Sequence, residues 1–289
     1  MNEPNRLIAD ASRRLARSGR GLARREAEWV LGHVVGLPPL ELYLRATPVT
    51  AGEAERFWSI IEARAQGAPL QYALGTAEFF GRPFRVGPGV FIPRPETEAI
   101  AHAALEAFRA LHRNRLRPLR FLEFGVGSGC LAVTIACELP TCRLVGIEVS
   151  WSALAIAREN IQRHGVGDRV ALIQGHWERP LAEARFDGII ANPPYVPTDD
   201  LTRLPVDVRQ EPRESLDGGP DGMTHVRRLL SASQALLEPG GVVVVECGED
   251  QVDLLMAQAA AAPWVAQCRA VTDVAQRPRG LVITARPSP

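Results

Sequence analysis

The sequence contains no lysine: all 33 of its basic residues are arginine. Catalysis through a Schiff base or a lysine nucleophile is therefore excluded. The 33 arginines are balanced by 33 acidic residues, which leaves a formal net charge of zero. Proteins that grip a nucleic-acid backbone usually carry a basic excess, because phosphate neutralisation dominates their affinity. We therefore do not expect DNA or RNA to be the main substrate.

Cysteine, histidine and long apolar runs are also sparse. The five cysteines are odd in number and form no C-x-x-C pair, which predicts reduced thiols in a cytoplasmic protein. The six histidines are scattered, with no H-E-x-x-H motif, so no metal site is expected. No apolar run approaches the ~20 residues of a membrane helix. The first residues lack the basic and apolar regions of a signal peptide. We expect no membrane partner.

What the chain does have is a change of pattern along its 289 residues. Residues 1–75 carry apolar side chains at i, i+3, i+4 spacing, which predicts a small N-terminal helical bundle. Residues 76–95 predict a β-hairpin around a glycine turn and then an extended, proline-rich connector. Residues 96–289 begin with a helix at 96–112 and a loop at 113–120, after which strands and helices alternate. These three ranges are the expected domains and their linker.

The alternation predicts an α/β fold, a doubly wound, mostly parallel, Rossmann-like sheet. The expected strands cover 120–124, 143–149, 170–174, 188–191, 241–246 and 281–285. The expected helices lie near 128–138, 151–164, 222–237 and 249–261. Ligands of such sheets bind at the carboxyl ends of the strands. Residues that directly follow a strand are therefore the first candidates for a functional site.

The most informative of these positions is Asn192-Pro193-Pro194-Tyr195, which follows an apolar strand. The Asn192 side-chain oxygen and a proline carbonyl can accept hydrogen bonds from an NH2 group, and the rigid prolines hold these acceptors in place. The Tyr195 ring can cover the flat face of an amide or a base. The motif therefore indicates alkylation of a planar nitrogen, with a simple proline-rich turn as the alternative.

A glycine-rich turn follows the first strand of the alternating region and opens a helix. It consists of Gly125, Val126, Gly127, Ser128 and Gly129. The alternate glycines let a ligand approach the backbone closely. Their G-x-G-x-G spacing matches the dinucleotide fingerprint only weakly, and a tight strand–helix turn is the alternative interpretation.

Two further side chains stand at strand ends. Glu148 ends the second strand, where a carboxylate binds ribose hydroxyls in doubly wound folds; the alternative is a solvated glutamate. Trp177 follows the third strand and can lie against an adenine ring, or be an ordinary surface aromatic; His176 beside it is assigned no role. Together with Asn192 and its neighbours, this order predicts an S-adenosylmethionine-dependent methyltransferase. It disfavours a hydride-transfer enzyme, which has no use for an amide clamp.

Over nearly its full length the chain resembles the release-factor glutamine N5-methyltransferases, the PrmC/HemK family. The most specific matching segments are 69–81, 90–98 (Val-Phe-Ile-Pro-Arg-Pro-Glu-Thr-Glu), 192–196, 211–213 and 216–222. Asn-Pro-Pro-Tyr also occurs in amino methyltransferases of adenine, whereas the segments at 90–98 and 211–213 are more restrictive. Three positions depart from the family, which more often has Asp-Leu-Gly where Glu123-Phe124-Gly125 stands, Asp where Glu148 stands and an acidic residue where His176 stands. A glutamate is one methylene longer and can still bind two hydroxyls.

The resemblance implies an N-terminal helical domain that helps to hold a release factor, a β-hairpin linker and a class I methyltransferase domain. The acceptor is then the glutamine of the Gly-Gly-Gln motif in class 1 peptide chain release factors. The turn from Gly125 to Gly129, Glu148 and Trp177 would bind S-adenosyl-L-methionine, which leaves as S-adenosyl-L-homocysteine. Asn192 would contact cofactor and substrate, and Pro193, Pro194 and Tyr195 would complete the glutamine pocket. Asn192, Pro193 and Tyr195 are the expected catalytic residues.

Several alternatives stay open. A methyltransferase for exocyclic amines of DNA or RNA would need a basic funnel and stacking aromatics beyond Tyr195. An enzyme for a ribosomal-protein glutamine would typically have a different segment at 92–98, and a non-catalytic binding module would keep only the fold. The 211–222 block is either a structural loop or a substrate contact. Arg94 and Glu96 either shape the pocket entrance or cap the helix that follows.

Overall fold

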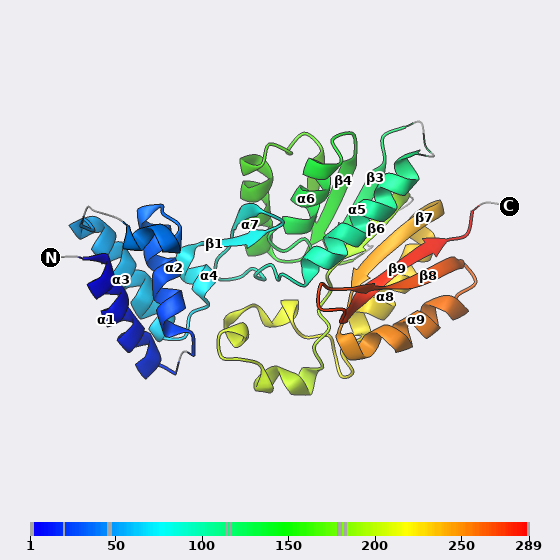
Figure 1. The fold of residues 1–289 in the computed structure, drawn as a ribbon. Helices are drawn as coiled ribbons and strands as arrows, with labels where there is room; N and C mark the ends of the chain where they lie inside the picture. The colour runs from blue at the N-terminus through cyan, green and yellow to red at the C-terminus, as the bar shows by residue number, and fades with distance from the viewer. Residues whose placement is uncertain are drawn as a thin grey trace. The chain divides into compact units, whose positions relative to one another are not determined.

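The computed structural model describes residues 3–19, 21–44, 48–113, 115, 117–177, 181 and 184–287. The chain divides into two compact units (Figure 1). One unit comprises the chain up to Thr76 together with Pro205–Gln210, and the other comprises Ala77–Leu204 and the chain from Glu211 onward. Asn114 and Leu116, in the loop expected at 113–120, lie outside the described residues, as do parts of the 1–75 range and the last two residues.

The helical unit confirms the predicted N-terminal helices. Its elements are α1 (Pro4–Arg17), α2 (Ala23–Val35), η1 (Pro39–Tyr43), α3 (Ala51–Ala65) and α4 (Leu70–Leu74). A capping box starts α3: the Thr50 hydroxyl accepts from the Glu53 N–H, and the Glu53 carboxylate accepts from the Thr50 N–H. The apolar faces meet in one core in which Phe57 and Ile61 are completely buried. The i, i+3, i+4 spacing in the sequence is the signature of these faces.

A buried arginine holds part of this unit together. The Arg64 guanidinium on α3 donates to both carboxylate oxygens of Glu26 on α2, at 2.7 and 3.1 Å. It also donates to Asp207 at 3.2 Å, in the segment that joins the helical unit from far along the chain. Such charge-assisted, two-pronged bonds fix geometry as well as adding stability. No pattern in the sequence predicts this long-range pairing.

The second unit starts with the predicted hairpin and contains the predicted sheet. The hairpin strands are β1 (Thr76–Phe79) and β2 (Arg82–Arg85). The strands of the large sheet are β3 (Arg120–Phe124), β4 (Arg143–Glu148), β5 (Val170–Gln174), β6 (Phe186–Ala191), β7 (Leu237–Glu246), β8 (Val265–Thr272) and β9 (Pro278–Ala285). The helices are α5 (Thr97–Arg113), α6 (Cys130–Glu138), α7 (Trp151–Arg163), α8 (Thr224–Leu236) and α9 (Val252–Ala261). Short 3-10 turns are η3 (Thr198–Arg203), η5 (Arg213–Ser215) and η6 (Glu249–Gln251), whereas η4 (Val208–Gln210) lies in the segment that belongs to the helical unit.

The strand order is β5-β4-β3-β6-β7-β9-β8. The pairs among β5, β4, β3, β6 and β7 are parallel, which confirms the doubly wound prediction. The strands β9 and β8 close one edge in antiparallel pairing. The chain builds outward from β3 to β5 and then returns to the other side at β6, so the direction of winding switches next to β3. Ligands of open α/β sheets bind at such a switch point.

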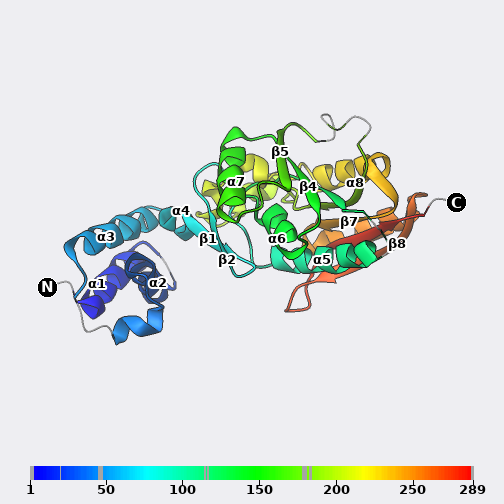
Figure 2. The same cartoon turned by 90° about the horizontal axis from the view of Figure 1, so that it is seen from above.

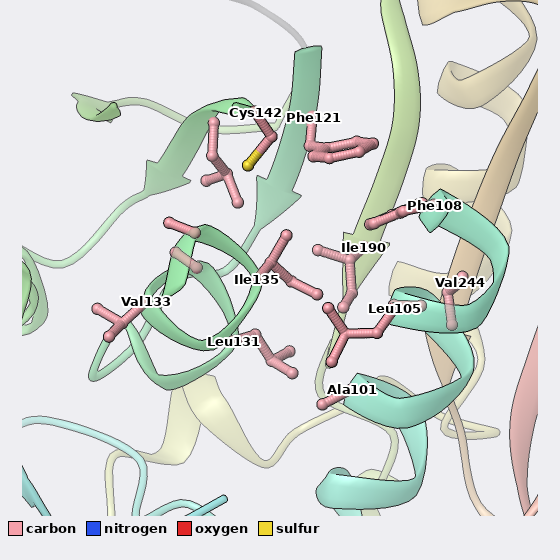
Figure 3. Close-up of a cluster of buried hydrophobic side chains, with 14 of the residues drawn as sticks. Ala101, Leu105, Phe108, Phe121, Leu131, Val133, Ile135, Cys142, Ile190 and Val244 are labelled. Carbon is pink, nitrogen blue, oxygen red and sulfur yellow. The ribbon is translucent and has the colours of Figure 1, made fainter. Parts of the chain in front are cut away.

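Apolar side chains of the central strands alternate between the two faces of the sheet. Phe121 and Ile190 pack with α5 and α6, whereas Leu122 and Ile189 pack with α8 and α9. Figure 2 shows α5 and α6 on one face of the sheet and α8 on the other. In the first of these cores, Phe108 of α5 stacks on Phe121 with ring centroids 4.0 Å apart (Figure 3). The Phe108 ring sits so close to Gly188 that an added Cβ would lie 2.3 Å from it, so β6 needs glycine there.

Candidate active site

The register of the sheet brings the functional positions together. Phe124 pairs with Ile147 of β4 and with Ala191 of β6, and Ala191 pairs with Val245 of β7. Parallel strands that are aligned in this way end at one edge. The residues that follow in each strand are Gly125, Glu148, Asn192 and Glu246. Residues up to 121 positions apart in sequence thus stand in one row at the carboxyl edge of the sheet.

The glycine turn between β3 and α6 needs its glycines for two reasons. Gly125, Gly127 and Gly129 have φ of 70°, 55° and 80°, the left-handed region that other residues avoid. An added Cβ would meet no atom within 4 Å at Gly125 or Gly127, so this side of the turn has room for a ligand. The side chains of Val126 and Ser128 are buried, so these residues face a ligand through their backbone.

Glu148 braces this turn. Its Oε2 accepts the Gly127 N–H at 2.9 Å, while Oε1 accepts the N–H groups of Val149 and Ser150 at 2.8 and 2.9 Å. Each carboxylate oxygen has two lone pairs. Oε2 therefore keeps capacity for a further donor such as a ribose hydroxyl. The longer glutamate side chain reaches both the glycine turn and the turn into α7.

Glu123, just before the glycine turn, appears in the sequence analysis only as a departure from the family and was given no role there. The residue is 1 % exposed, and its Oε2 has no hydrogen-bond partner within the described part of the chain. Burial raises the pKa of Glu123 well above its ordinary value, and the nearby Glu148 raises it further. A buried carboxyl with an unused oxygen is the complement of a cationic ligand group. The available signal was its position near the end of a strand, as for Glu148.

Trp177 stands in the turn after β5, in a left-handed backbone conformation with φ of 58°. Its ring lies 5.4 Å from that of Phe124 and stacks on His225 of α8 at 5.5 Å. The Arg228 guanidinium lies 5.6 Å from the same ring. The structure thus fixes the indole beside the end of β3 and pairs it with His225, which the sequence analysis did not single out. His176 enters only as a neighbouring charge that lowers the pKa of His225, after burial, which is the main cause.

Asn192, Pro193, Pro194 and Tyr195 leave β6 at the centre of the row. The Asn192 Nδ2 donates to the Thr97 hydroxyl at 3.2 Å, and no described residue donates to its Oδ1. The Tyr195 hydroxyl donates to Glu246 Oε1 at 3.3 Å. Burial raises the pKa of the Tyr195 phenol above its usual range. The motif therefore presents the neutral carboxamide oxygen of Asn192, the rigid turn of Pro193 and Pro194 (the proline corner) and the un-ionised ring of Tyr195.

Thr97 and Glu246 are the partners of this motif, and the sequence analysis gave neither of them a role. Thr97 is the first residue of α5 and is 2 % exposed, and Glu246 is the last residue of β7 and is also 2 % exposed. Glu246 Oε2 has no partner among the described residues. Burial raises the pKa of Glu246 to about 7, although hydrogen bonds from Thr97 and Tyr195 lower it. The signal for Glu246 was an acidic residue directly after the run Val242–Val245.

The 211–222 block lies against the Asn-Pro-Pro-Tyr segment and braces its backbone. Val196 donates its N–H to the Leu216 carbonyl at 3.0 Å and accepts from the Gly218 N–H at 2.8 Å. The Gly222 Cα lies so close to Tyr195 that an added Cβ would be 2.3 Å from the Tyr195 carbonyl oxygen. The observed contacts are those of a structural loop.

The same block is tied to the segment before α5. The Glu211 carboxylate, 1 % exposed as a side chain, accepts the Ile92 N–H at 2.9 Å and pairs with the Arg94 guanidinium. Arg94 also lies 4.8 Å over the Phe91 ring. The two most restrictive motifs of the sequence, around Arg94 and Glu211, are thus bonded to each other.

Two family models match parts of the chain. Residues 6–75 match the model of the PrmC N-terminal domain, and residues 100–207 match the model of the methyltransferase small domain. The release factor glutamine methyltransferase of Moorella thermoacetica is 42 % identical over 251 residues, covering 84 % of this chain and 85 % of the relative. The chain belongs to the release factor glutamine methyltransferase family. The family members of Geobacter sulfurreducens and Bradyrhizobium diazoefficiens are 43 % and 34 % identical and cover 84 % and 98 % of this chain, and 83 % and 95 % of their own lengths.

A solved structure of low sequence identity has the same fold. The hMettl16 catalytic domain, solved with the MAT2A 3'UTR hairpin 6, has a TM-score of 0.54 and 14 % identity over 82 % of each chain. In the part of the chain that the structure describes, no helix is long and apolar enough to cross a membrane. The same residues include no group of three or more metal-binding side chains.

Members of this family are methyltransferases, and S-adenosylmethionine is the cofactor. The site has what this cofactor requires. The turn has open backbone at Gly125 and Gly127, and Glu148 can accept ribose hydroxyls. Glu123 adds a carboxyl oxygen without a partner in the described chain, which suits the cationic methionine end. These are the residues that would hold the cofactor.

Proposed function

We propose that this protein transfers the methyl group of S-adenosylmethionine to the side-chain nitrogen N5 of the glutamine in the Gly-Gly-Gln motif of class 1 peptide chain release factors. The observation that supports this most is the row of Gly125, Glu148 and Asn192 at one sheet edge, with the proline–tyrosine corner directly after it. This row sets an acceptor for an amide NH2 beside a turn that fits the methyl donor. The methylation would modulate translation termination.

The chemistry assigned to the residues follows from what each can accept. S-adenosylmethionine supplies a methyl group bound to a positively charged sulfur. The Asn192 Oδ1 and the Pro193 carbonyl accept the two N–H bonds of the glutamine amide, which holds its nitrogen in line for attack. Both acceptors favour the positive charge that grows on this nitrogen as the N–CH3 bond forms. Tyr195 packs on the amide plane and excludes water. The methylated nitrogen then loses a proton, so no strong base is needed beforehand.

Three stretches of the chain have different roles in this proposal. We propose that residues 1–75 form a domain that helps to hold the release factor, that residues 76–95 link it through the hairpin, and that residues 96–289 carry out methyl transfer. A release factor is a translation protein, so the reaction would take place in the cytoplasm. The zero net charge of the chain supports a protein rather than a nucleic acid as substrate.

The test is transfer of labelled methyl from S-adenosylmethionine to a purified class 1 release factor. The Gln→Ala variant of its Gly-Gly-Gln motif and duplex DNA are assayed beside it. We expect label on the wild-type factor alone. Label on DNA, or on both forms of the factor, would contradict the proposed substrate while leaving the cofactor assignment intact.

Replacement of Asn192 tests the roles of the residues. Asn192→Ala removes an acceptor that acts on the reacting amide, so turnover should fall about 100-fold or more. Cofactor affinity, measured by isothermal titration calorimetry, should change little. Equal losses in turnover and in cofactor affinity would contradict the assigned role of Asn192.

A further inference from the structure

The direction in which the Asn192 carboxamide points decides whether it can act as an acceptor. An asparagine side chain has an oxygen on one side and an NH2 group on the other, and its partners determine which side faces a ligand. Here the NH2 side donates to Thr97 Oγ1 at 3.2 Å. Thr97 also lies close enough to the buried Glu246 carboxyl to lower its pKa, and this carboxyl accepts from the Tyr195 hydroxyl at 3.3 Å. Thr97 thus links Asn192 to a buried acid that also contacts Tyr195.

We propose that Thr97 and Glu246 are positioning residues that form a relay, which fixes the Asn192 carboxamide with its oxygen toward the substrate amide. The inference rests on the proposed function and assigns roles to two residues that do not themselves touch the substrate. The relay runs from the end of β7 through the start of α5 to the end of β6. In the sequence, Glu246 lies 51 positions from Tyr195, and Thr97 lies 95 positions from Asn192.

The number of protons in the relay sets its direction. A carboxylate can only accept hydrogen bonds, and a hydroxyl has a single proton to donate. When Glu246 is ionised, the Thr97 proton goes to Glu246. The remaining lone pairs of Thr97 can then only accept, so they require the Nδ2 side of Asn192. The Oδ1 side is left to face the substrate.

The opposite direction would prevent the reaction. With its NH2 group toward the substrate, Asn192 would set N–H donors against the N–H donors of the glutamine amide. Both sets would then lose their partners in a site shielded from water, which costs more than a lost bond in solution. The acceptor that favours charge on the reacting nitrogen would also be gone.

Protonation of Glu246 removes the constraint. A neutral carboxyl can donate to Thr97, whose proton is then free to go to Asn192 Oδ1. Burial raises the pKa of Glu246 to about 7, and hydrogen bonds from Thr97 and Tyr195 lower it. The other titratable or charged groups near this carboxyl are Glu96, which raises its pKa, Arg279, which lowers it, and the thiols of Cys130 and Cys247. Turnover should therefore fall as the pH drops through about 7.

The experiment compares variants of the full-length protein. Thr97→Val removes the hydroxyl and should lower kcat about 100-fold, with unchanged affinity for S-adenosylmethionine, whereas Thr97→Ser should retain activity. Glu246→Gln should lower kcat and abolish the decline below neutral pH. The matched control is Thr134→Val, which removes a fully buried hydroxyl on α6 that has no partner among the described residues. Its kcat should equal that of the wild type.

A second readout needs no substrate. The chain has five asparagines, so selective 15N-asparagine labelling gives few side-chain amide signals, and Asn192→Asp identifies the one to follow. This signal should shift in Thr97→Val and in Glu246→Gln but not in Thr134→Val. In the wild type it should titrate with the pKa of Glu246, about 7. In Glu246→Gln the titration should be absent.

The outcomes separate the relay from the proposed function. Wild-type kcat in Thr97→Val, equal losses in Thr97→Ser and Thr97→Val, or an Asn192 signal insensitive to both variants would overturn the relay. An unchanged pH profile in Glu246→Gln would also overturn it. Failure of the wild type to methylate a release factor would refute the proposed function instead. The amide signal of Asn192 would then still decide whether the relay exists.

Discussion

Glu246 should make the stability of the fold depend on pH in a direction opposite to that of a salt-bridged acid. Burial raises the pKa of Glu246 from its ordinary 4.5 to about 7 in the fold. Between these two pH values the folded state keeps a proton that the unfolded chain has lost. The free energy of unfolding must therefore decrease as the pH rises through this interval. At pH 8, one unit above the folded pKa, the loss is nearly complete.

The size of the effect follows from the two pKa values. One pKa unit corresponds to about 1.4 kcal/mol, so the difference between 7 and 4.5 corresponds to about 3 kcal/mol. Glu246→Gln keeps the shape of the side chain but cannot ionise. The variant should therefore gain about 3 kcal/mol relative to the wild type as the pH is raised across this interval, with most of the gain between pH 5 and 8. At pH 8 the variant is expected to be the more stable protein.

The assay is urea unfolding of wild type and Glu246→Gln at several pH values, without cofactor. Other groups that titrate, such as Glu123, cancel in the difference between the two proteins. Glu55→Gln, which removes an exposed carboxyl from the helical unit, is the control and should follow the wild-type curve. Parallel curves for wild type and Glu246→Gln would refute the reasoning. A more stable Glu246→Gln would also show that its expected loss of turnover is not a loss of folding.

Two further predictions concern the glycine turn and the tie between the two restrictive motifs. Gly129→Ala forces a Cβ onto a residue with φ of 80°, at 3.4 Å from the Ala157 Cβ, so it should cost about 1–3 kcal/mol and weaken cofactor binding in calorimetry. Gly167→Ala, where φ is not positive and the nearest atom is 3.9 Å away, is the matched control and should do neither. Glu211→Ala leaves the Ile92 N–H and the Arg94 guanidinium without their buried acceptor, so it should lower the unfolding free energy by about 3–5 kcal/mol in urea titrations. A cost near zero would mean that water replaces the carboxylate.

The parallel sheet could be predicted because its strands are buried on both faces. Buried parallel strands read as short continuous apolar runs, such as Val242–Val245, and every strand of the large sheet except one was identified. The exception is β8 (Val265–Thr272), an edge strand that pairs only with β9. Its burial does not alternate regularly, and half of it faces solvent, so its sequence has no strand pattern. Propensity alone does not distinguish such an edge from a loop.

The site was predictable only where each residue carries its signal locally. The glycine turn, Glu148 and Asn192 all follow strands, and their residue types match a known chemistry. The partners of Asn192 gave no such signal. Thr97 was expected only as part of a helix that starts near residue 96, and Asn192, which it contacts, lies 95 residues further along the chain. The stacking of His225 on Trp177 likewise depends on where α8 packs on the sheet. Contacts of this kind come from tertiary packing, which cannot be read from the local pattern of a single sequence.

The buried polar atoms without partners point to the same place as the motifs. Among the described residues, three side-chain atoms are buried and unpaired, and two of them are carboxylate oxygens, of Glu123 and Glu246. Each costs stability, since an unpaired buried acid must either stay protonated or remain charged in a poor solvent. An apolar residue in either position would remove that cost. Both acids stand at the carboxyl edge of the sheet, at or near the ends of β3 and β7 on either side of β6. The fold thus keeps two destabilising acids at the sheet edge that carries Asn192, which is where the reaction is expected to take place.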